Sequence, residues 1–337
     1  MQTLGIDVGS SSIKIAVYDA VQQKTLARTF FPENELSIEV PLPDWAEQKP
    51  DIWWHSLKGA LHKIKHQIDL KNIQAIGISY QMHGLVAIDK NLTPVRPAII
   101  WCDSRAVKIG ERAFDALKNQ DYLDQHLNAP GNFTASKLAW VKENEPETYA
   151  RIWKFMLPGD YLALKLSGRP TTTEAGLSEG ALWDFKNKMI STQLMDYYGF
   201  SKTLIPDIVP SLGVQCHVSQ WAAKELGLTP DIPITYRAGD QPNNALSLNV
   251  LEPGELATTA GTSAVIYGVT DKPLYDAKSR INTFLHVNNT LKNDRNGMLL
   301  CVNGAGILYS WLKKLLNTTA ELIDYNDLNN LSERAPP

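Results

Sequence analysis

The chain has 337 residues, of which 44% are hydrophobic and 20% charged, and its formal net charge is −3. This length is enough for two domains or one large one, the composition is that of a soluble globular protein, and the charge argues against a nucleic-acid or membrane partner. The three cysteines show no CxxC spacing and no apolar run has the length of a transmembrane helix or signal peptide, so we expect a cytoplasmic protein without a disulfide framework or zinc site.

The first predicted element is a β-hairpin. Apolar or alternating residues at 3–8 and 13–18 flank the sequence GSSS at 9–12, which indicates two strands joined by a tight polar turn. Glycine permits such a turn, and successive backbone N–H groups with serine hydroxyls can hold phosphate oxygens. Asp7, just before the turn, could coordinate a hydrated Mg²⁺ on those phosphates. The alternative is a plain hairpin turn.

The elements that follow alternate between strands and helices. Apolar spacing predicts a helix over 51–68, beginning after Pro50, and further helices over 105–118, 135–144 and 158–167, the last ending at Gly168. Short apolar runs predict strands over 73–79, 84–88, 98–101 and 232–240. This alternation indicates an α/β architecture.

Two polar stretches interrupt the middle of this pattern. The first is SYQMHG, which places Gln81, Met82 and His83 at a strand break. His83 could hydrogen-bond a polyol, and the alternative is a structural residue, which is the more frequent role of a lone histidine. The second is WCDSRA, where Trp101 offers an apolar wall and Asp103 with Arg105 offers polar contacts. The alternative for this second stretch is a solvated Asp–Arg pair at a helix start.

Asp240 stands between a predicted strand and a helical stretch. In α/β proteins ligands bind outside the carboxyl ends of strands, and a carboxylate there can take a proton from a substrate hydroxyl. The alternative is that Asp240 is the N-cap of the helix that begins with QPNNALSL.

The plan of residues 4–19 recurs at 255–271, where GTS at 261–263 stands for GSSS. This repeat suggests two domains of similar build that face each other, the first over 1–245 and the second over 246–337. Since domains typically have roughly 100–150 residues, we expect the second domain to be incomplete in this sequence.

The ordered motifs resemble one family. They are GIDVGSSSIKIAVYDA, DWAEQKPDIWW, GISYQMHGLVAID, RPAIIWCDSR, KLAWVKEN, LPGDYLALKLSG, AGDQPNNA and TTAGTS, which together cover essentially the whole chain. In this order they are similar to the FGGY carbohydrate kinases. The resemblance implies an actin-like ATPase fold of duplicated ribonuclease-H-like domains with a cleft between them. It also implies phosphoryl transfer from MgATP to a sugar hydroxyl, and a homodimer is a family expectation.

The resemblance assigns roles to individual residues. Asp240 matches the catalytic base, and Asp7 matches the carboxylate near Mg²⁺. The residues expected to bind ATP phosphates are Gly9, Ser10, Ser11, Ser12, Lys14, Gly261, Thr262 and Ser263. The residues expected on the substrate side are Gln81, Met82, His83, Trp101, Asp103 and Gln241.

The QMHG and WAEQ…WW stretches resemble the branch of the family that phosphorylates D-xylulose to D-xylulose 5-phosphate. Two departures leave the sugar open: Gln241 follows the matched base where asparagine is frequent, and Cys102 stands where asparagine is common. The alternatives are a kinase for another pentulose or polyol, and a non-catalytic sugar-binding fragment. The last follows because we find no glycine-rich segment that would hold adenine and ribose.

Overall fold

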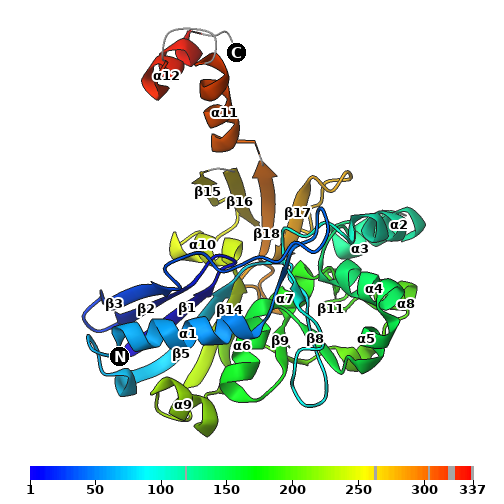
Figure 1. Ribbon diagram of the computed structural model, residues 1–337. Helices are drawn as coiled ribbons and strands as arrows, with labels where there is room; N and C mark the ends of the chain where they lie inside the picture. Colours follow the sequence, from blue (N-terminus) through cyan, green and yellow to red (C-terminus); the bar gives the residue numbers. More distant parts are fainter. Residues whose placement is uncertain (118–119, 262–263, 303, 318–322, 335–337) are drawn as a thin grey trace.

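A six-stranded mixed sheet forms the centre of the computed structural model, which describes residues 1–117, 120–261, 264–302, 304–317 and 323–334 (Figure 1). The strand order is β13-β14-β5-β1-β2-β3, where β1 and β2 form the predicted hairpin. The strands are β1 (Gln2–Val8), β2 (Ile13–Asp19), β3 (Lys24–Phe31), β5 (Ile73–Tyr80), β13 (Leu212–His217) and β14 (Pro233–Gly239).

Helices cover one face of this sheet. They are α1 (Asp51–Ile64), α6 (Pro158–Ser167) and α9 (Gln220–Leu226). Alternate residues of β1, such as Leu4, Ile6 and Val8, are buried in the same core as Trp53 and Leu57 of α1, as the period of two in a strand and the helical spacing predict. α6 has its predicted bounds and ends at Gly168, whose φ of +75° suits glycine. α1 ends four residues earlier than predicted.

The predicted strands at 84–88 and 98–101 are shorter and lie outside the main sheet. β6 (Val86–Ile88) pairs with β8 (Lys154–Met156), and β7 (Ala98–Ile99) pairs with β4 (Glu47–Gln48). The remaining elements up to residue 247 are η1 (Leu70–Asn72), α2 (Val107–Leu117), α3 (Gln120–His126), α4 (Thr134–Asn144), α5 (Pro146–Arg151), β9 (Thr171–Thr173), α7 (Glu174–Glu179), β10 (Trp183–Asp184), β11 (Met189–Ile190), α8 (Thr192–Tyr198), η2 (Lys202–Leu204), β12 (Asp207–Val209) and α10 (Asp240–Ser247).

A second, four-stranded antiparallel sheet has the order β15-β16-β18-β17. Its strands are β15 (Leu256–Ala260), β16 (Ala264–Thr270), β17 (Ile281–Leu285) and β18 (Asn296–Val302). The succession β15-β16-β18 repeats the antiparallel succession β1-β2-β3, and its first hairpin is the one predicted from the internal repeat. β17 is held to the preceding part of the chain because the Leu285 N–H donates to Ser178 Oγ at 2.9 Å and the Asn128 amide pairs with the Thr283 backbone.

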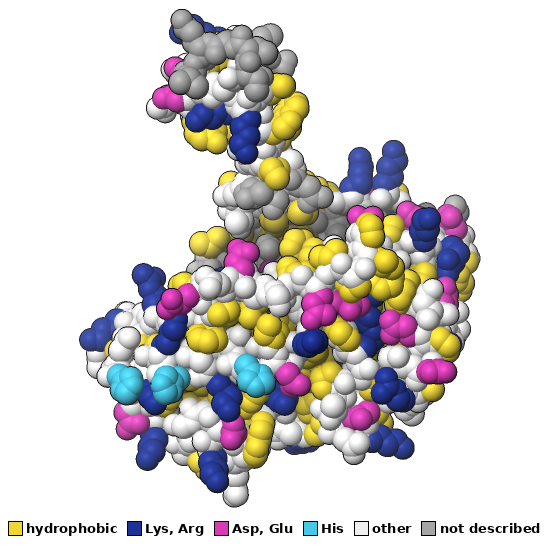
Figure 2. All heavy atoms as spheres, in the orientation of Figure 1, with side chains coloured by type: hydrophobic (Ala, Val, Ile, Leu, Met, Phe, Trp, Pro, Cys, Tyr) yellow, Lys and Arg dark blue, Asp and Glu magenta, His cyan; other side chains and the backbone are white. Residues whose placement is uncertain are grey.

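The chain continues into α11 (Gly306–Leu316) and α12 (Tyr325–Glu333), which project beyond the four-stranded sheet (Figure 1). Hydrophobic side chains stand exposed at this projecting end (Figure 2), among them Ile307, Leu308 and Trp311. Among the helices within the described residues, none is long and apolar enough to cross a bilayer.

Candidate active site

Three parallel strands bring the first candidate residues to one edge of the main sheet. Tyr80 at the end of β5 is in register with Val8 of β1 and with Gly239 of β14. The residue after each strand therefore lies at the same edge, and these residues are Gly9, Gln81 and Asp240. The Gln81 N–H donates to Val8 O at 2.9 Å. This is the carboxyl edge, where α/β proteins bind ligands.

Asp240 is the first residue of α10 and not its N-cap. The N-cap is Gly239, and no side chain caps this helix, so the alternative of a capping aspartate is wrong. Burial, and next the negative charge of Asp7, raise the pKa of Asp240 from its ordinary value to about 6, whereas hydrogen bonds from Gln241 oppose the shift. Gly239 has no room for a side chain, because a Cβ would lie 2.5 Å from Met82 Cγ. The site thus holds a carboxylate that is ionised at neutral pH and that does not cap the N-terminus of α10.

Asp7 and Lys14 are cross-strand partners beside this edge. Lys14 Nζ lies 3.2 Å from Asp7 Oδ2, and the Asp7 side chain is 35% exposed. Both residues line a cavity of about 610 Å³ on the sheet, together with Ser79 and Tyr236. The carboxylate of Asp7 is therefore accessible, and a cationic side chain accompanies it.

The turn over 9–12 is tight and polar. The Gly9 N–H donates to Ser12 O at 3.1 Å, and a Cβ at Gly9 would lie 2.9 Å from that same oxygen, so the turn requires glycine. Among the described residues, the backbone N–H groups of Ser10 and Ser11 find no hydrogen-bond acceptor. The buried Gln48 side chain fixes the turn, because its Nε2 donates to Ser10 O at 2.7 Å. The loop therefore presents free donors of the kind that bind phosphate oxygens.

The second predicted phosphate loop is described only in part. Gly261 follows β15 and is exposed, and its carbonyl accepts a hydrogen bond from the Gly306 N–H at 3.0 Å. Thr262 and Ser263 lie outside the described residues.

The Gln81–His83 segment lies next to Asp240. The Gln81 side chain is buried and donates to Gln48 Oε1 at 3.3 Å, and Met82 is buried against Gly239. His83 is partly exposed, and its ring packs against Phe133 and Phe284 with centroid distances of 4.8 and 5.4 Å.

The His83 imidazole is neutral at physiological pH. Burial, with the positive charge of Lys137 as a second cause, lowers the pKa of His83 to about 3. Its Nδ1 lies 3.1 Å from Glu179 O, and within the described residues its Nε2 makes no hydrogen bond. His83 thus combines a structural contact with one ring nitrogen that remains available to a ligand.

Trp101 and Asp103 differ sharply in exposure. Trp101 is 54% exposed, and its Nε1 lies 3.5 Å from Ser10 Oγ of the first loop. Asp103 is fully buried, and its carboxylate accepts from the Ala46 N–H at 2.6 Å and from the Arg105 guanidinium, also at 2.6 Å. The Asp–Arg pair at this helix start is therefore real, but the alternative of a solvated pair is wrong.

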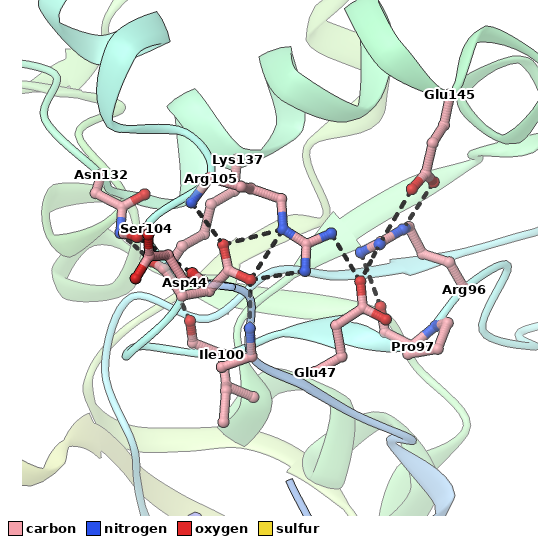
Figure 3. A network of polar contacts seen from close by, with 12 residues as sticks. Asp44, Glu47, Arg96, Pro97, Ile100, Ser104, Arg105, Asn132, Lys137 and Glu145 are labelled. Carbon is pink, nitrogen blue, oxygen red and sulfur yellow. Dashed lines mark hydrogen bonds and ion pairs between the residues drawn. The ribbon is translucent and has the colours of Figure 1, made fainter. Parts of the chain in front are cut away.

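A buried polar network supports this loop (Figure 3). Arg105 lies 2.7 Å from Glu47. Its guanidinium also stacks on Trp45, 3.8 Å from the ring centroid. Arg96 joins Glu47 to Glu145 in the same network. Charges that are buried and paired in this way hold the segment over 44–47 and the segment over 101–105 in one arrangement.

Sequence reasoning missed three residues that shape the site. Gln48 and Lys137 lie in the motifs WAEQ and KLAWVKEN, but nothing in those motifs shows which segments their side chains reach. Glu179 carries no local signal at all, since its contacts with His83 span 96 positions. Spatial convergence of this kind cannot be read from spacing along one chain.

Comparison with known proteins gives one consistent family. Residues 2–247 match the model described as the FGGY family of carbohydrate kinases, N-terminal domain. The chain is 28% identical over 284 residues to the xylulose kinase of Escherichia coli (strain K12) and 32% identical over 286 residues to that of Lactococcus lactis subsp. lactis (strain IL1403). Each match covers 84% of this chain but only 57% and 56% of the respective relative, so the chain spans little more than half their length.

Solved structures agree in fold. A crystal structure of a xyloylose kinase from Brucella ovis has a TM-score of 0.85 and 26% identity, covering 94% of this chain and 63% of that one. Plasmodium falciparum glycerol kinase with ADP has a TM-score of 0.84 at 20% identity, covering 99% of this chain and 66% of the other, and therefore speaks for the fold alone.

Proposed function

Since the chain belongs to the FGGY family of carbohydrate kinases and has their actin-like α/β fold, we propose that it supplies the acceptor site and base for phosphorylating a ketose. The proposed reaction transfers the γ-phosphoryl group of ATP to a hydroxyl of D-xylulose and gives D-xylulose 5-phosphate. The observation that carries this proposal is Asp240, a carboxylate at the carboxyl edge of the sheet whose pKa is raised to about 6.

The proposed base has the protonation state that the reaction needs. Above pH 6 Asp240 is a carboxylate, and it accepts the proton of the attacking hydroxyl while that oxygen forms its bond to the γ-phosphorus and the bond to the β-phosphate oxygen breaks. A general base is most effective when its pKa lies near the working pH, which burial and the charge of Asp7 bring about here.

The first loop suits the phosphates of the donor. The free N–H groups of Ser10 and Ser11 and the ammonium of Lys14 would contact phosphate oxygens, and Gly261, Thr262 and Ser263 remain the predicted second loop. Asp7 fits Mg²⁺ as a single accessible carboxylate, because Mg²⁺ commonly takes one or two carboxylates and completes its shell with phosphate oxygens and water. Within the described residues, no group of three or more histidine, cysteine or acidic side chains could hold a metal alone. When bound, the ion neutralises phosphate charge.

D-xylulose is the proposed acceptor because the relatives named above are xylulose kinases. His83 Nε2, the Trp101 ring and Gln241 are the groups that we propose to contact the sugar. We propose that Gln81 and Asp103 support the acceptor site without contacting the sugar, since their side chains are buried in contacts with Gln48 and Arg105. Another pentulose or polyol is the second candidate, because Gln241 and Cys102 stand where asparagine is common in the family.

Turnover with a panel of acceptors tests this function. The chain is supplied with MgATP and D-xylulose, D-ribulose, glycerol or gluconate, and ADP is measured. We expect D-xylulose to give the highest kcat/KM, and Asp240→Asn to lower kcat by about 10²–10⁴-fold while acceptor binding persists. Phosphorylation of glycerol or gluconate without D-xylulose would refute the acceptor, and wild-type turnover by Asp240→Asn would refute the base. Sugar binding without any ADP would favour a non-catalytic sugar-binding role.

A further inference from the structure

His83 has a backbone conformation that its surroundings must enforce. Its φ is +61°, in the left-handed region that residues with a side chain rarely adopt. Its backbone N–H and its carbonyl each form a hydrogen bond with a buried side chain, one acidic and one basic. The His83 N–H donates to Glu179 Oε1 at 3.1 Å, and the His83 carbonyl accepts from Lys137 Nζ at 2.8 Å.

Lys137 ties this residue to a second part of the site. Its side chain, on α4, is fully buried, and Nζ also donates to Ile100 O at 3.1 Å, one residue before Trp101 (Figure 3). The amine of Lys137 therefore binds the carbonyls of His83 and Ile100, which belong to two different loops and are 17 positions apart in the sequence. Even a neutral amine has the two protons that these two carbonyls require.

Glu179 ties the same residue to a third part of the site. It is the last residue of α7 and is buried, and its Oε2 accepts from Tyr80 OH at 3.2 Å. That oxygen would also lie 2.8 Å from a Cβ at Gly239, so it abuts the residue directly before Asp240. Glu179 thus contacts both His83 and the backbone that presents the proposed base.

We infer that Lys137 and Glu179 are positioning residues that grip His83 from both sides and thereby set the geometry of the acceptor site. The inference rests on the proposed function in that the ligand of this site is a sugar acceptor. Their contacts are with His83 itself, with Ile100, which precedes Trp101, and with Gly239, which precedes Asp240. His83, Trp101 and Asp240 are the groups proposed to act on the acceptor. Neither residue is proposed to touch the sugar.

The same helix offers a matched control for Lys137. Lys142, also on α4, donates to Tyr198 O at 2.7 Å and to Gly199 O at 2.6 Å. It likewise holds two backbone carbonyls, but these belong to the end of α8 and not to any segment of the site. Lys137 is fully buried and Lys142 only partly, so the control matches the loss of two lysine–carbonyl hydrogen bonds on α4 and not the loss of a buried side chain. A loss of helix stability through these hydrogen bonds would affect both variants, whereas a loss of site geometry would affect only Lys137→Met.

The test compares Lys137→Met with Lys142→Met. We expect Lys137→Met to raise the KM for D-xylulose at least about tenfold while the KM for ATP changes less than about threefold. Amide hydrogen exchange, followed by mass spectrometry, should become faster in peptides covering 81–84 and 99–103. Lys142→Met should change neither quantity. Equal effects of the two variants on acceptor KM and on exchange in these peptides would overturn the inference.

Glu179 supplies the second pair of variants, which decides the matter should Lys137→Met not fold. Glu179→Gln keeps an acceptor for the His83 N–H and is expected to hold the acceptor KM within about threefold, whereas Glu179→Leu should raise it about tenfold or more. Equal behaviour of the two would overturn the role of Glu179. A wild-type chain that phosphorylates no sugar would instead refute the proposed function, and hydrogen exchange would still test the grip on His83.

Discussion

At the scale of the residue, Asp240 is a carboxyl group whose ionised form is disfavoured by its surroundings. Its side chain is half-buried, and this burial, followed by the negative charge of Asp7, raises the pKa of Asp240 to about 6. A carboxyl group whose pKa in the folded state exceeds its unfolded value near 3.8 stabilises the fold below that value, and this contribution is lost as the pH rises through 6. At neutral pH the ionised Asp240 therefore lowers the free energy of unfolding.

We predict that Asp240→Asn is more stable than the wild type at pH 7, by about 1–2 kcal/mol after allowance for partial solvent access. The difference should shrink toward zero as the pH falls to about 4, where the wild-type carboxyl is protonated. Urea unfolding of both proteins at several pH values measures this. Asp276→Asn is the control of opposite sign, because Arg280 lowers the pKa of Asp276 and the variant should lose stability at pH 7. An Asp240→Asn variant less stable than the wild type at pH 7 would contradict the prediction.

At the scale of the element, two glycines in and next to α6 exclude a side chain for different reasons. Gly159 lacks space, and Gly168 has a left-handed backbone conformation. A Cβ at Gly159 would lie 2.1 Å from the ring of Tyr80, which is fully buried. Gly168 has φ +75° and open space around it. Gly159→Ala should cost about 1–3 kcal/mol by overpacking, and Gly168→Ala about 1 kcal/mol through its left-handed backbone.

These two variants should also differ in the acceptor site. Displacement of the Tyr80 ring disturbs its hydrogen bond to Glu179, so only Gly159→Ala should raise the acceptor KM. Denaturation midpoints and steady-state kinetics of the two variants check both parts. The account fails here if Gly168→Ala changes the acceptor KM as much as Gly159→Ala does.

The elements themselves were largely predictable, because each is marked by a local pattern. The bounds of α6 and the hairpin of β1 and β2 follow from apolar spacing, a glycine and a polar turn. β6 and β7 were predicted as strands, but their pairing with β8 and β4 was not, because a short apolar run does not show which strand it pairs with. The contacts of Lys137 and Glu179 could not be predicted, since they join positions 54 and 96 residues apart.

At the scale of the whole molecule, the candidate site lies where the main sheet, its surrounding loops and α10 meet. The division into a domain over 1–245 and a second from 246 remains a prediction, and β17 is firmly attached across it through Ser178 and Asn128. The chain spans little more than half the length of the two relatives named above. Binding of the acceptor and binding of the nucleotide can each be titrated by itself, which tests the proposed acceptor site without relying on turnover.

The most direct measurement is therefore calorimetric titration of D-xylulose and, separately, of MgATP into this chain. The account predicts saturable binding of D-xylulose at one site per chain, with glycerol and gluconate weaker. Asp240→Asn, which removes the proposed base but leaves His83 and Trp101 in place, should bind the sugar nearly as well as the wild type. A cooperatively folded chain that binds glycerol or gluconate, and gives no heat with D-xylulose, would contradict the central claim.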